Sequence, residues 1–148
     1  MCLICERIDW IENGKNPYFV KELETGYVVT GDHQHFKGYT LFLCKQHVTE
    51  LHELPRSFRD KHLSEMADIS AAVSKAYSAD KMNIESLGNG DSHLHWHLFP
   101  RKSGDLGSYG MNGKGPVWWL PFEKMYSDEM IITGKKLEEL KQLLLNEL

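Results

Sequence analysis

His93-Leu94-His95-Trp96-His97-Leu98-Phe99 is the stretch of sequence from which the rest of the chain can be interpreted. Histidine alternates here with apolar residues, and a period of two is typical of a β-strand. The imidazoles are therefore expected on one face of the strand, with neighbouring side chains roughly 6.6 Å apart. A row of histidines on one strand face has no structural reason, so it predicts a site that holds a metal or a row of substrate phosphates.

Two kinds of chemistry fit this histidine row. In the first, the imidazoles bind a zinc or similar ion that activates water, although such a site usually adds a carboxylate and the row contains none. In the second, the middle residue, His95, attacks a phosphorus atom while His93 and His97 hold the phosphate oxygens. The order of the residues favours the second chemistry, because a central nucleophile has partners on both sides. Nearby polar residues that could contact a phosphate are Asn89, Ser92 and Arg101.

The composition is that of an ordinary globular protein of one domain. The chain has 148 residues, of which 41% are hydrophobic and 26% charged, which argues against a disordered or fibrous protein. The formal net charge of −4 argues against bulk binding of nucleic acid. No apolar run reaches the ~18 residues of a membrane helix, and the N-terminus lacks the order of a signal peptide. We therefore expect a cytoplasmic protein with no membrane partner.

Short segments rich in aromatic and β-branched residues, bounded by glycine-containing turns, predict an antiparallel sheet. These segments are 18–23, 27–30, 39–44 and 81–88. With the histidine strand they give about five strands. A long helix is expected to run to about Ser78, with Pro55 and Ser57 marking its start and Asp60 three residues after Ser57 in the manner of a capping box. An apolar stripe on one face of this helix is predicted from Phe58, His62, Met66, Ile69, Val73 and Tyr77. The fold class is therefore α+β.

Residues 103–148 are expected to form a loop followed by a helical extension. The glycine-rich loop that runs to Pro116 is too long for a simple connector, so we expect it to be mobile or functional. Trp118 and Trp119 follow it and should be buried on the chain's own sheet, over a pocket, or against a partner subunit. The last segment, 134–148, reads as an amphipathic helix.

The N-terminus offers a second candidate for metal binding. Cys2 and Cys5 form a C-x-x-C motif, and two thiolates at that spacing can bind one zinc ion, although a structural zinc site needs four ligands. No second C-x-x-C exists in the sequence, so histidines would have to complete the site. A thioredoxin-like redox role is disfavoured because the motif precedes any strand.

The histidine row also matches a family signature. The sequence resembles the histidine triad (HIT) superfamily of nucleotide hydrolases and transferases, whose motif His-φ-His-φ-His-φ-φ, with φ apolar, is matched at every position from His93 to Phe99. The Leu-Gly-Asn just before the row resembles the bacterial branch close to diadenosine polyphosphate hydrolases. The resemblance implies a HIT-like fold over residues 1–148 and a homodimer.

The resemblance further implies an enzyme that acts at the α-phosphate of an adenine-type nucleotide. The substrate would be a dinucleoside polyphosphate or a nucleoside phosphoramidate, and the intermediate a covalent nucleotidyl-histidine on His95. His97 would contact the phosphate and help the leaving group, and His93 would bond to the backbone. Asn89 falls where the family places an amide against the phosphates, and Asp32 lies near its ribose-binding acid. The adenine pocket would include apolar residues around Val28, Val29, Leu41 and Leu43.

The same resemblance implies a structural zinc ion, and no organic cofactor is expected. Cys2, Cys5 and His47 match an arrangement found in some bacterial members, and His93 is the natural fourth ligand. Two other functions stay open at this point. One is a nucleotide-binding adaptor with slow turnover, and the other is a metal-binding module in which the row itself holds the ion.

Overall fold

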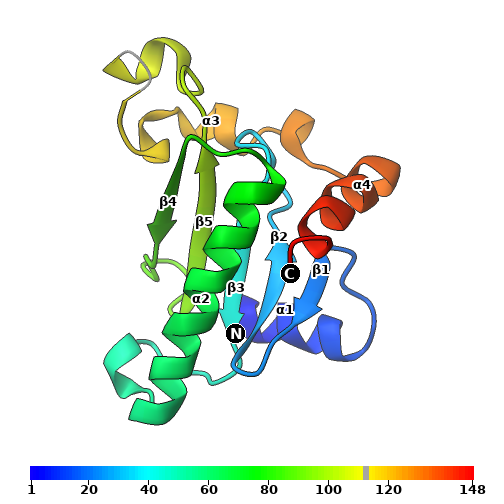
Figure 1. Ribbon diagram of the computed structural model, residues 1–148, viewed down its shortest axis with the longest axis vertical. Helices are drawn as coiled ribbons and strands as arrows, with labels where there is room; N and C mark the ends of the chain where they lie inside the picture. The colour runs from blue at the N-terminus through cyan, green and yellow to red at the C-terminus, as the bar shows by residue number, and fades with distance from the viewer. Residues whose placement is uncertain (112–113) are drawn as a thin grey trace.

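A computed structural model describes residues 1–111 and 114–148 (Figure 1). Its helices are α1 (Leu3–Glu12), α2 (Arg56–Ala76), α3 (Phe122–Met125) and α4 (Gly134–Leu145). Its strands are β1 (Phe19–Glu22), β2 (Gly26–Thr30), β3 (Thr40–Cys44), β4 (Lys81–Glu85) and β5 (His95–Arg101). Part of the predicted glycine-rich loop, residues 112–113, lies outside the described residues.

The strands form one antiparallel sheet of five strands in the order β1-β2-β3-β5-β4. The predicted α+β class and the antiparallel sheet are therefore confirmed. The histidine strand lies between β3 and β4, with Leu43 opposite His95 and Leu41 opposite His97. Because alternate residues share a face, these leucines lie on the same side of the sheet as the two histidines.

The prediction that all three histidines belong to one strand is wrong for His93, since β5 begins at His95. Leu94 ends a separate short connection: its N–H donates to the Val48 carbonyl at 2.8 Å and its carbonyl accepts from Cys44 N–H at 3.1 Å. These bonds hold His93 just outside the ladder. His93 is therefore free to face a different set of residues from the rest of the row.

Helix α2 covers one face of the sheet, and α4 packs beside it at the β1 edge (Figure 1). The predicted apolar stripe of α2 is confirmed, because Ile69 and Val73 are fully buried against Phe42 and Leu98 of the sheet. The helical extension at the C-terminus is also confirmed, and its buried residues are Leu137, Leu140 and Leu144. Among the described residues, no helix is long and apolar enough to cross a membrane.

The predicted capping box of α2 is wrong. The helix begins at Arg56 after Pro55, so Ser57 lies inside the first turn and no side chain caps the start. Proline has a fixed φ compatible with a helix start and no N–H that needs a partner. Pro55 therefore sets the boundary in place of the Ser57 hydroxyl.

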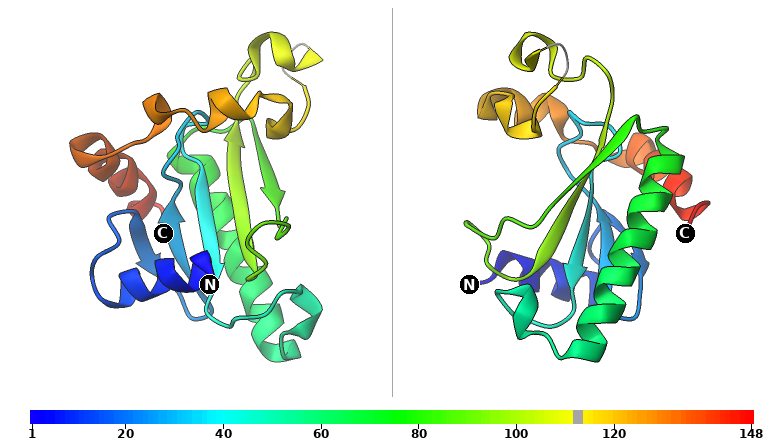
Figure 2. Two further views of the ribbon diagram at one scale, coloured as in Figure 1. Left: turned by 180° about the vertical axis from the view of Figure 1, so that it is seen from behind. Right: turned by 60° about the vertical axis from the view of Figure 1, so that its left-hand side comes forward.

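The opposite face of the sheet carries α1 at one end and the segment with α3 at the other (Figure 2). Ile4 and Ile8 of α1 pack on Tyr27 and Leu43. The expected burial of the two tryptophans is not found within this chain, because Trp118 and Trp119 keep 40% and 46% of their surface exposed. The Trp118 indole N–H instead donates to Glu85 at 2.7 Å, on strand β4.

Candidate functional site

A pocket is lined by residues of α1, β2, β3 and β5 and by Tyr126, which follows α3. The helix α1 and the segment with α3 lie on the sheet face opposite α2 (Figure 2). The floor of the pocket is made by β2, β3 and β5, and its walls come from α1 and from Tyr126. His95 and His97 both line it, together with Asp32. The pocket thus collects polar groups at one side of an otherwise apolar floor.

His95 is held in one orientation by its own main chain. Its Nδ1 lies 2.6 Å from the carbonyl oxygen of His93, and a carbonyl can only accept, so Nδ1 carries the proton. The lone pair of the imidazole is therefore on Nε2. An imidazole in this tautomer is a nucleophile whose reactive nitrogen has a fixed direction.

His97 faces a hydroxyl where His95 faces a carbonyl. The Tyr39 hydroxyl lies 2.6 Å from His97 Nδ1. A phenol can donate or accept a hydrogen bond, and when this one donates, the proton of the neutral imidazole is on Nε2. Burial, and secondarily the neighbouring His95, lowers the pKa of His97 to about 4. Burial also raises the pKa of Tyr39 well above its usual value, so the phenol stays protonated. His97 is thus neutral at pH 7, and its ring centre lies 4.8 Å from that of His95.

His93 faces away from the pocket toward the N-terminal cysteines. Its Nε2 donates to the Cys44 carbonyl at 2.7 Å, which leaves the lone pair on Nδ1. That nitrogen lies 3.5 Å from Cys2 Sγ and 3.3 Å from Cys5 Sγ. A metal-binding histidine commonly donates its second nitrogen to a carbonyl in this way.

The donor atoms of Cys2, Cys5, His47 and His93 lie within 4.8 Å of one another. Two thiolates and two imidazoles form a ligand set typical of structural zinc. The Cys2 sulfur also accepts the Cys5 N–H at the start of α1. Burial and the neighbouring Cys2 raise the pKa of the Cys5 thiol, so a bound cation would be needed to hold both sulfurs as thiolates. These residues therefore fit a zinc ion.

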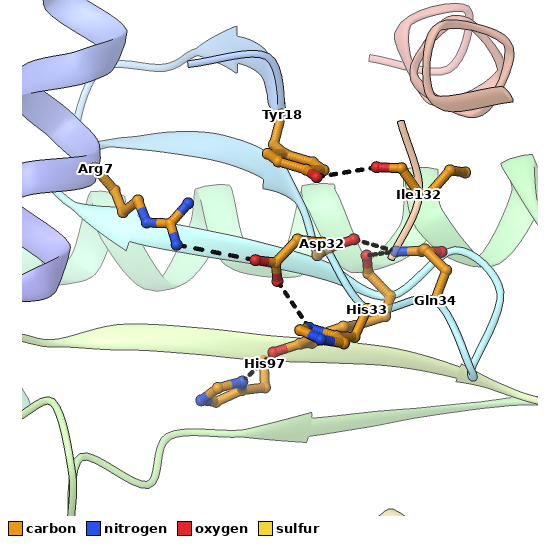
Figure 3. Close-up of polar contacts among 9 residues, drawn as sticks. Arg7, Tyr18, Asp32, His33, Gln34, His97 and Ile132 are labelled. Carbon is orange, nitrogen blue, oxygen red and sulfur yellow. Dashed lines mark hydrogen bonds and ion pairs between the residues drawn. The ribbon is translucent and has the colours of Figure 1, made fainter. Parts of the chain in front are cut away.

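Asp32 lies on the loop after β2, at the rim of the pocket (Figure 3). Its carboxylate is 3.9 Å from the Arg7 guanidinium and 3.4 Å from His33 Nδ1. Its main-chain carbonyl accepts the Ile132 N–H at 2.9 Å, so the C-terminal segment also fixes the loop. The structure thus brings the expected ribose-binding acid to the same pocket as His95 and His97.

Sequence comparison identifies the family. The profile described as HIT domain matches residues 18–104, which is more than half of the chain. The chain belongs to the histidine triad (HIT) family. No curated protein sequence matches it.

Solved HIT structures share the fold. A histidine triad protein from Sinorhizobium meliloti 1021 gives a TM-score of 0.74 at 22% identity, with 88% of each chain covered. A hypothetical histidine triad nucleotide-binding protein from Sulfolobus tokodaii gives 0.68 at 19% identity, over 97% of this chain and 91% of that chain. A Zn-bound histidine triad family protein from Mycobacterium smegmatis gives 0.65 at 22% identity, over 99% of this chain and 91% of that chain.

Not every predicted site residue reaches the HIT pocket. Asn89 is exposed and does not line it. Ser92 lines a second hollow, on the β4 side, that meets the first at His95. Val28 is fully buried in the core beneath α2, because it is one residue out of phase with Val29, which does line the pocket.

Arg101 is placed differently from the expectation. Six residues of extended chain separate it from His95, a distance of about 20 Å. Its guanidinium is buried against both carboxylate oxygens of Asp105 at 2.8 Å and against Asn83 at 2.7 Å. The structure therefore does not support a phosphate contact by Arg101, which instead ties β5 to the following loop.

Several pocket residues were missed by sequence reasoning, among them Tyr39, Arg7 and Tyr126. Tyr39 could have been found, because it comes just before β3 and is two residues from Leu41, in phase with it. Arg7 could have been suspected from its place two residues after Cys5 of the C-x-x-C motif. No local pattern in the sequence points to Tyr126, which reaches the pocket only through the path of the C-terminal segment.

Proposed function

We propose that this HIT protein is a nucleotide hydrolase or nucleotidyl transferase acting at the α-phosphate of adenine-type nucleotides. The observation that carries the proposal is that His95, whose lone pair is on Nε2, shares one pocket with His97, whose Nδ1 is bonded to the Tyr39 hydroxyl. In this proposal the hydroxyl donates, so that His97 offers a proton on Nε2. A nucleophile next to a donor is what phosphoryl-centred displacement needs. Dinucleoside polyphosphates and nucleoside phosphoramidates both remain proposed substrates.

In the proposed first step, a bond forms between His95 Nε2 and the α-phosphorus, and the bond from phosphorus to the leaving group breaks. The electron pair goes with the leaving group, whose negative charge is stabilised by a hydrogen bond from His97 Nε2. In the second step water attacks the same phosphorus, the bond from phosphorus to His95 Nε2 breaks so that His95 leaves as a neutral imidazole, and the proton released by the water goes to the leaving group. The products are a nucleoside monophosphate and the protonated leaving group.

Binding of the nucleoside is proposed to use the rest of the pocket. Val29, Leu41 and Leu43 line its apolar floor and suit a purine ring. Asp32 is proposed to accept hydrogen bonds from the ribose. Ser92 and Asn89 remain proposed contacts to the phosphate, from the connection that leads into His93.

Zinc is proposed as a structural ion on Cys2, Cys5, His47 and His93. When bound, it would hold both sulfurs as thiolates and join α1 to the start of β5. Support comes from the clustering of the four donor atoms, and one HIT structure with the same fold is described as zinc-bound. In the cell we propose a cytoplasmic homodimer, as the family resemblance implies.

The rival metal-binding module, in which the histidine row itself holds the ion, is disfavoured by the membership of the metal-ligand cluster. Among the described residues, the metal-ligand cluster includes His93 but neither of the other two histidines. The rival adaptor with slow turnover differs from the enzyme only in rate, and kinetics distinguishes the two.

The decisive experiment compares wild type with His95→Ala on a panel of adenine dinucleotides and adenosine phosphoramidates. Loss of the nucleophile should reduce kcat by at least about 10⁴-fold, and only wild type should form a nucleotidyl-protein adduct, detected by mass spectrometry. His52→Ala is the matched control, because His52 is an exposed histidine that does not line the pocket. Failure of wild type to turn over any substrate, or equal turnover by His95→Ala, would contradict the covalent mechanism.

A further inference from the structure

The C-terminal segment reaches the pocket although it lies outside the matched HIT region, residues 18–104. It runs alongside the loop that carries Asp32 (Figure 3). Gln34 N–H donates to the Met130 carbonyl at 2.8 Å, and Ile132 N–H donates to the Asp32 carbonyl at 2.9 Å. The Tyr18 hydroxyl adds a bond to the Ile132 carbonyl at 2.9 Å. The segment is therefore fixed to the loop by main-chain bonds.

Tyr126, at the end of α3, is the pocket residue that this segment supplies. Its ring packs edge-on against His33, with ring centres 5.2 Å apart, and against Phe122 at 4.8 Å. The ring is thus held from two sides. Within the described part of the chain, its hydroxyl has no hydrogen-bond partner. Burial, followed by Asp32 and Glu85, raises the pKa of this hydroxyl, so it remains a donor at neutral pH.

The residues around the pocket can be assigned to the three parts of a nucleotide, which are the base, the ribose and the phosphate. Ile4 and Leu43 form an apolar wall and floor at the α1 end, which suits the base. His95 and His97 define the place of the α-phosphate. Asp32 and Tyr126 are among the other polar residues of the lining, and ribose is the part of the nucleotide that lies between base and phosphate.

We infer that Tyr126 is a specificity-determining residue whose hydroxyl hydrogen-bonds the ribose beside Asp32. This inference rests on the proposed nucleotide-binding function. A carboxylate can only accept hydrogen bonds, whereas a phenol can donate to a sugar oxygen. A ribose hydroxyl can therefore donate a hydrogen bond to Asp32 and accept one from Tyr126. A deoxyribose that lacks this hydroxyl leaves both side chains without a partner.

The test measures dissociation constants of adenosine 5′-monophosphate and of its 2′-deoxy and 3′-deoxy analogues by calorimetry on the full chain. Tyr126→Phe keeps the ring and its packing and removes only the hydroxyl. It should weaken binding of the ribonucleotide about 5- to 10-fold, the effect of one hydrogen bond. It should leave binding of at least one deoxy analogue almost unchanged. Tyr109→Phe is the matched control, because Tyr109 is an exposed tyrosine away from the pocket.

The outcomes separate the inference from the function on which it rests. If wild type binds the ribonucleotide and Tyr126→Phe binds it equally well, Tyr126 makes no ribose contact and only the inference is overturned. The same holds if the substitution weakens all three ligands equally, since the effect is then structural. If wild type binds none of the ligands, the proposed function fails and the inference fails with it.

Discussion

Each imidazole of the histidine row has a different neighbour, and the neighbour decides what the imidazole can do. His93 donates to the Cys44 carbonyl and turns a lone pair toward two sulfurs. His95 donates to the His93 carbonyl and turns a lone pair elsewhere. His93 therefore contacts both the cysteine cluster and the pocket. Its side chain faces the two cysteines, and its carbonyl accepts a hydrogen bond from His95, the proposed nucleophile. Identical residues at equal spacing thus acquire unequal roles.

Tyr39→Phe tests the assignment of His97 as the hydrogen-bond donor to the leaving group. Without the phenol, nothing in the described pocket fixes the proton on Nε2, and the imidazole divides between tautomers. We expect kcat to fall about 5- to 10-fold, as for loss of one hydrogen bond, with little change in KM because the ring and its stacking on Phe99 are kept. The measurement is steady-state kinetics on the substrate that wild type turns over fastest.

The matched control is Tyr27→Phe, because the Tyr27 hydroxyl bonds to Glu12 and its side chain does not line the pocket. An equal loss of kcat in both variants would assign the effect to general destabilisation. A rise in KM alone for Tyr39→Phe would mean that the phenol serves substrate binding and not the tautomer of His97.

At the residue scale, spacing in the sequence is the better guide where the partners are neighbours in a motif. Cys2 and Cys5 lie together, and His95 and His97 line one pocket, although His93 faces the other way. Arg101 is near the row in sequence but at the wrong end of a strand, because the pocket lies beside the first residues of β5. The position of Tyr126 depends only on the path of the C-terminal segment through the fold, so no spacing of residues in the sequence could predict it.

At the element scale, α1 belongs to two sites at once. Cys2 caps its start and Cys5 lies in its first turn, and its residues Leu3, Ile4 and Arg7 line the pocket. A helix of 10 residues is marginal alone in water. Its position therefore depends on the packing of Ile4 and Ile8 and on the proposed zinc ion.

Cys2→Ser should remove zinc and weaken nucleotide binding together. Serine preserves the side-chain cap at the start of α1, so the substitution removes one metal ligand with little other change. We expect less than full zinc content by metal analysis, and about tenfold weaker binding of adenosine 5′-monophosphate, within the usual range of coupling between two sites. By the same linkage, the nucleotide should raise the zinc affinity of wild type about tenfold.

Cys44→Ala is the control for this experiment, because Cys44 is a buried cysteine outside the ligand cluster. Its zinc content should equal that of wild type. Full zinc in Cys2→Ser would contradict the proposed ligand set. If Cys2→Ser loses zinc but binds the nucleotide as tightly as wild type, the proposed metal site is supported and the proposed coupling between the two sites through α1 is contradicted.

Element boundaries show where the sequence is an incomplete guide. The strands and α2 follow from periodicity, which reports burial directly. The start of β5 does not, because the alternation of histidines continues through His93 while the ladder stops at His95. The hydrogen bonds of Leu94 to Val48 and Cys44 decide that boundary, and they come from a segment more than 40 residues away in the chain.

At the scale of the whole molecule, a buried polar network joins α2 to the sheet. His62 on α2 is fully buried, and its Nε2 accepts the Trp96 indole N–H at 3.0 Å. Its Nδ1 therefore carries the proton and donates to the Thr25 hydroxyl at 2.8 Å. Thr25 in turn donates to Glu65, whose carboxylate also accepts two main-chain N–H groups at 2.8 and 2.9 Å. The network links α2, the β1–β2 turn and the back of the histidine strand.

This network predicts sensitivity to acid. Burial lowers the pKa of His62 from 6.5 to about 4. A proton on His62 Nε2 would also face the Trp96 N–H and break the hydrogen bond between them. Between these two pKa values the unfolded chain binds a proton that the folded chain does not, so the free energy of unfolding falls as pH drops from about 6.5 to about 4. The loss from this residue is on the order of 3 kcal/mol in total.

Comparison with His62→Gln isolates this contribution from that of His97, whose pKa is also lowered to about 4. Glutamine can accept from Trp96 and donate to Thr25 but does not titrate in this range. We expect the variant to unfold more easily than wild type at pH 7, because the amide fits the site less well. Its curve of unfolding free energy against pH should nevertheless be shallower by up to about 1.4 kcal/mol per pH unit between pH 6.5 and 4. Urea unfolding at several pH values measures both quantities, and parallel curves for the two proteins would mean that His62 is not the buried group whose protonation opposes folding.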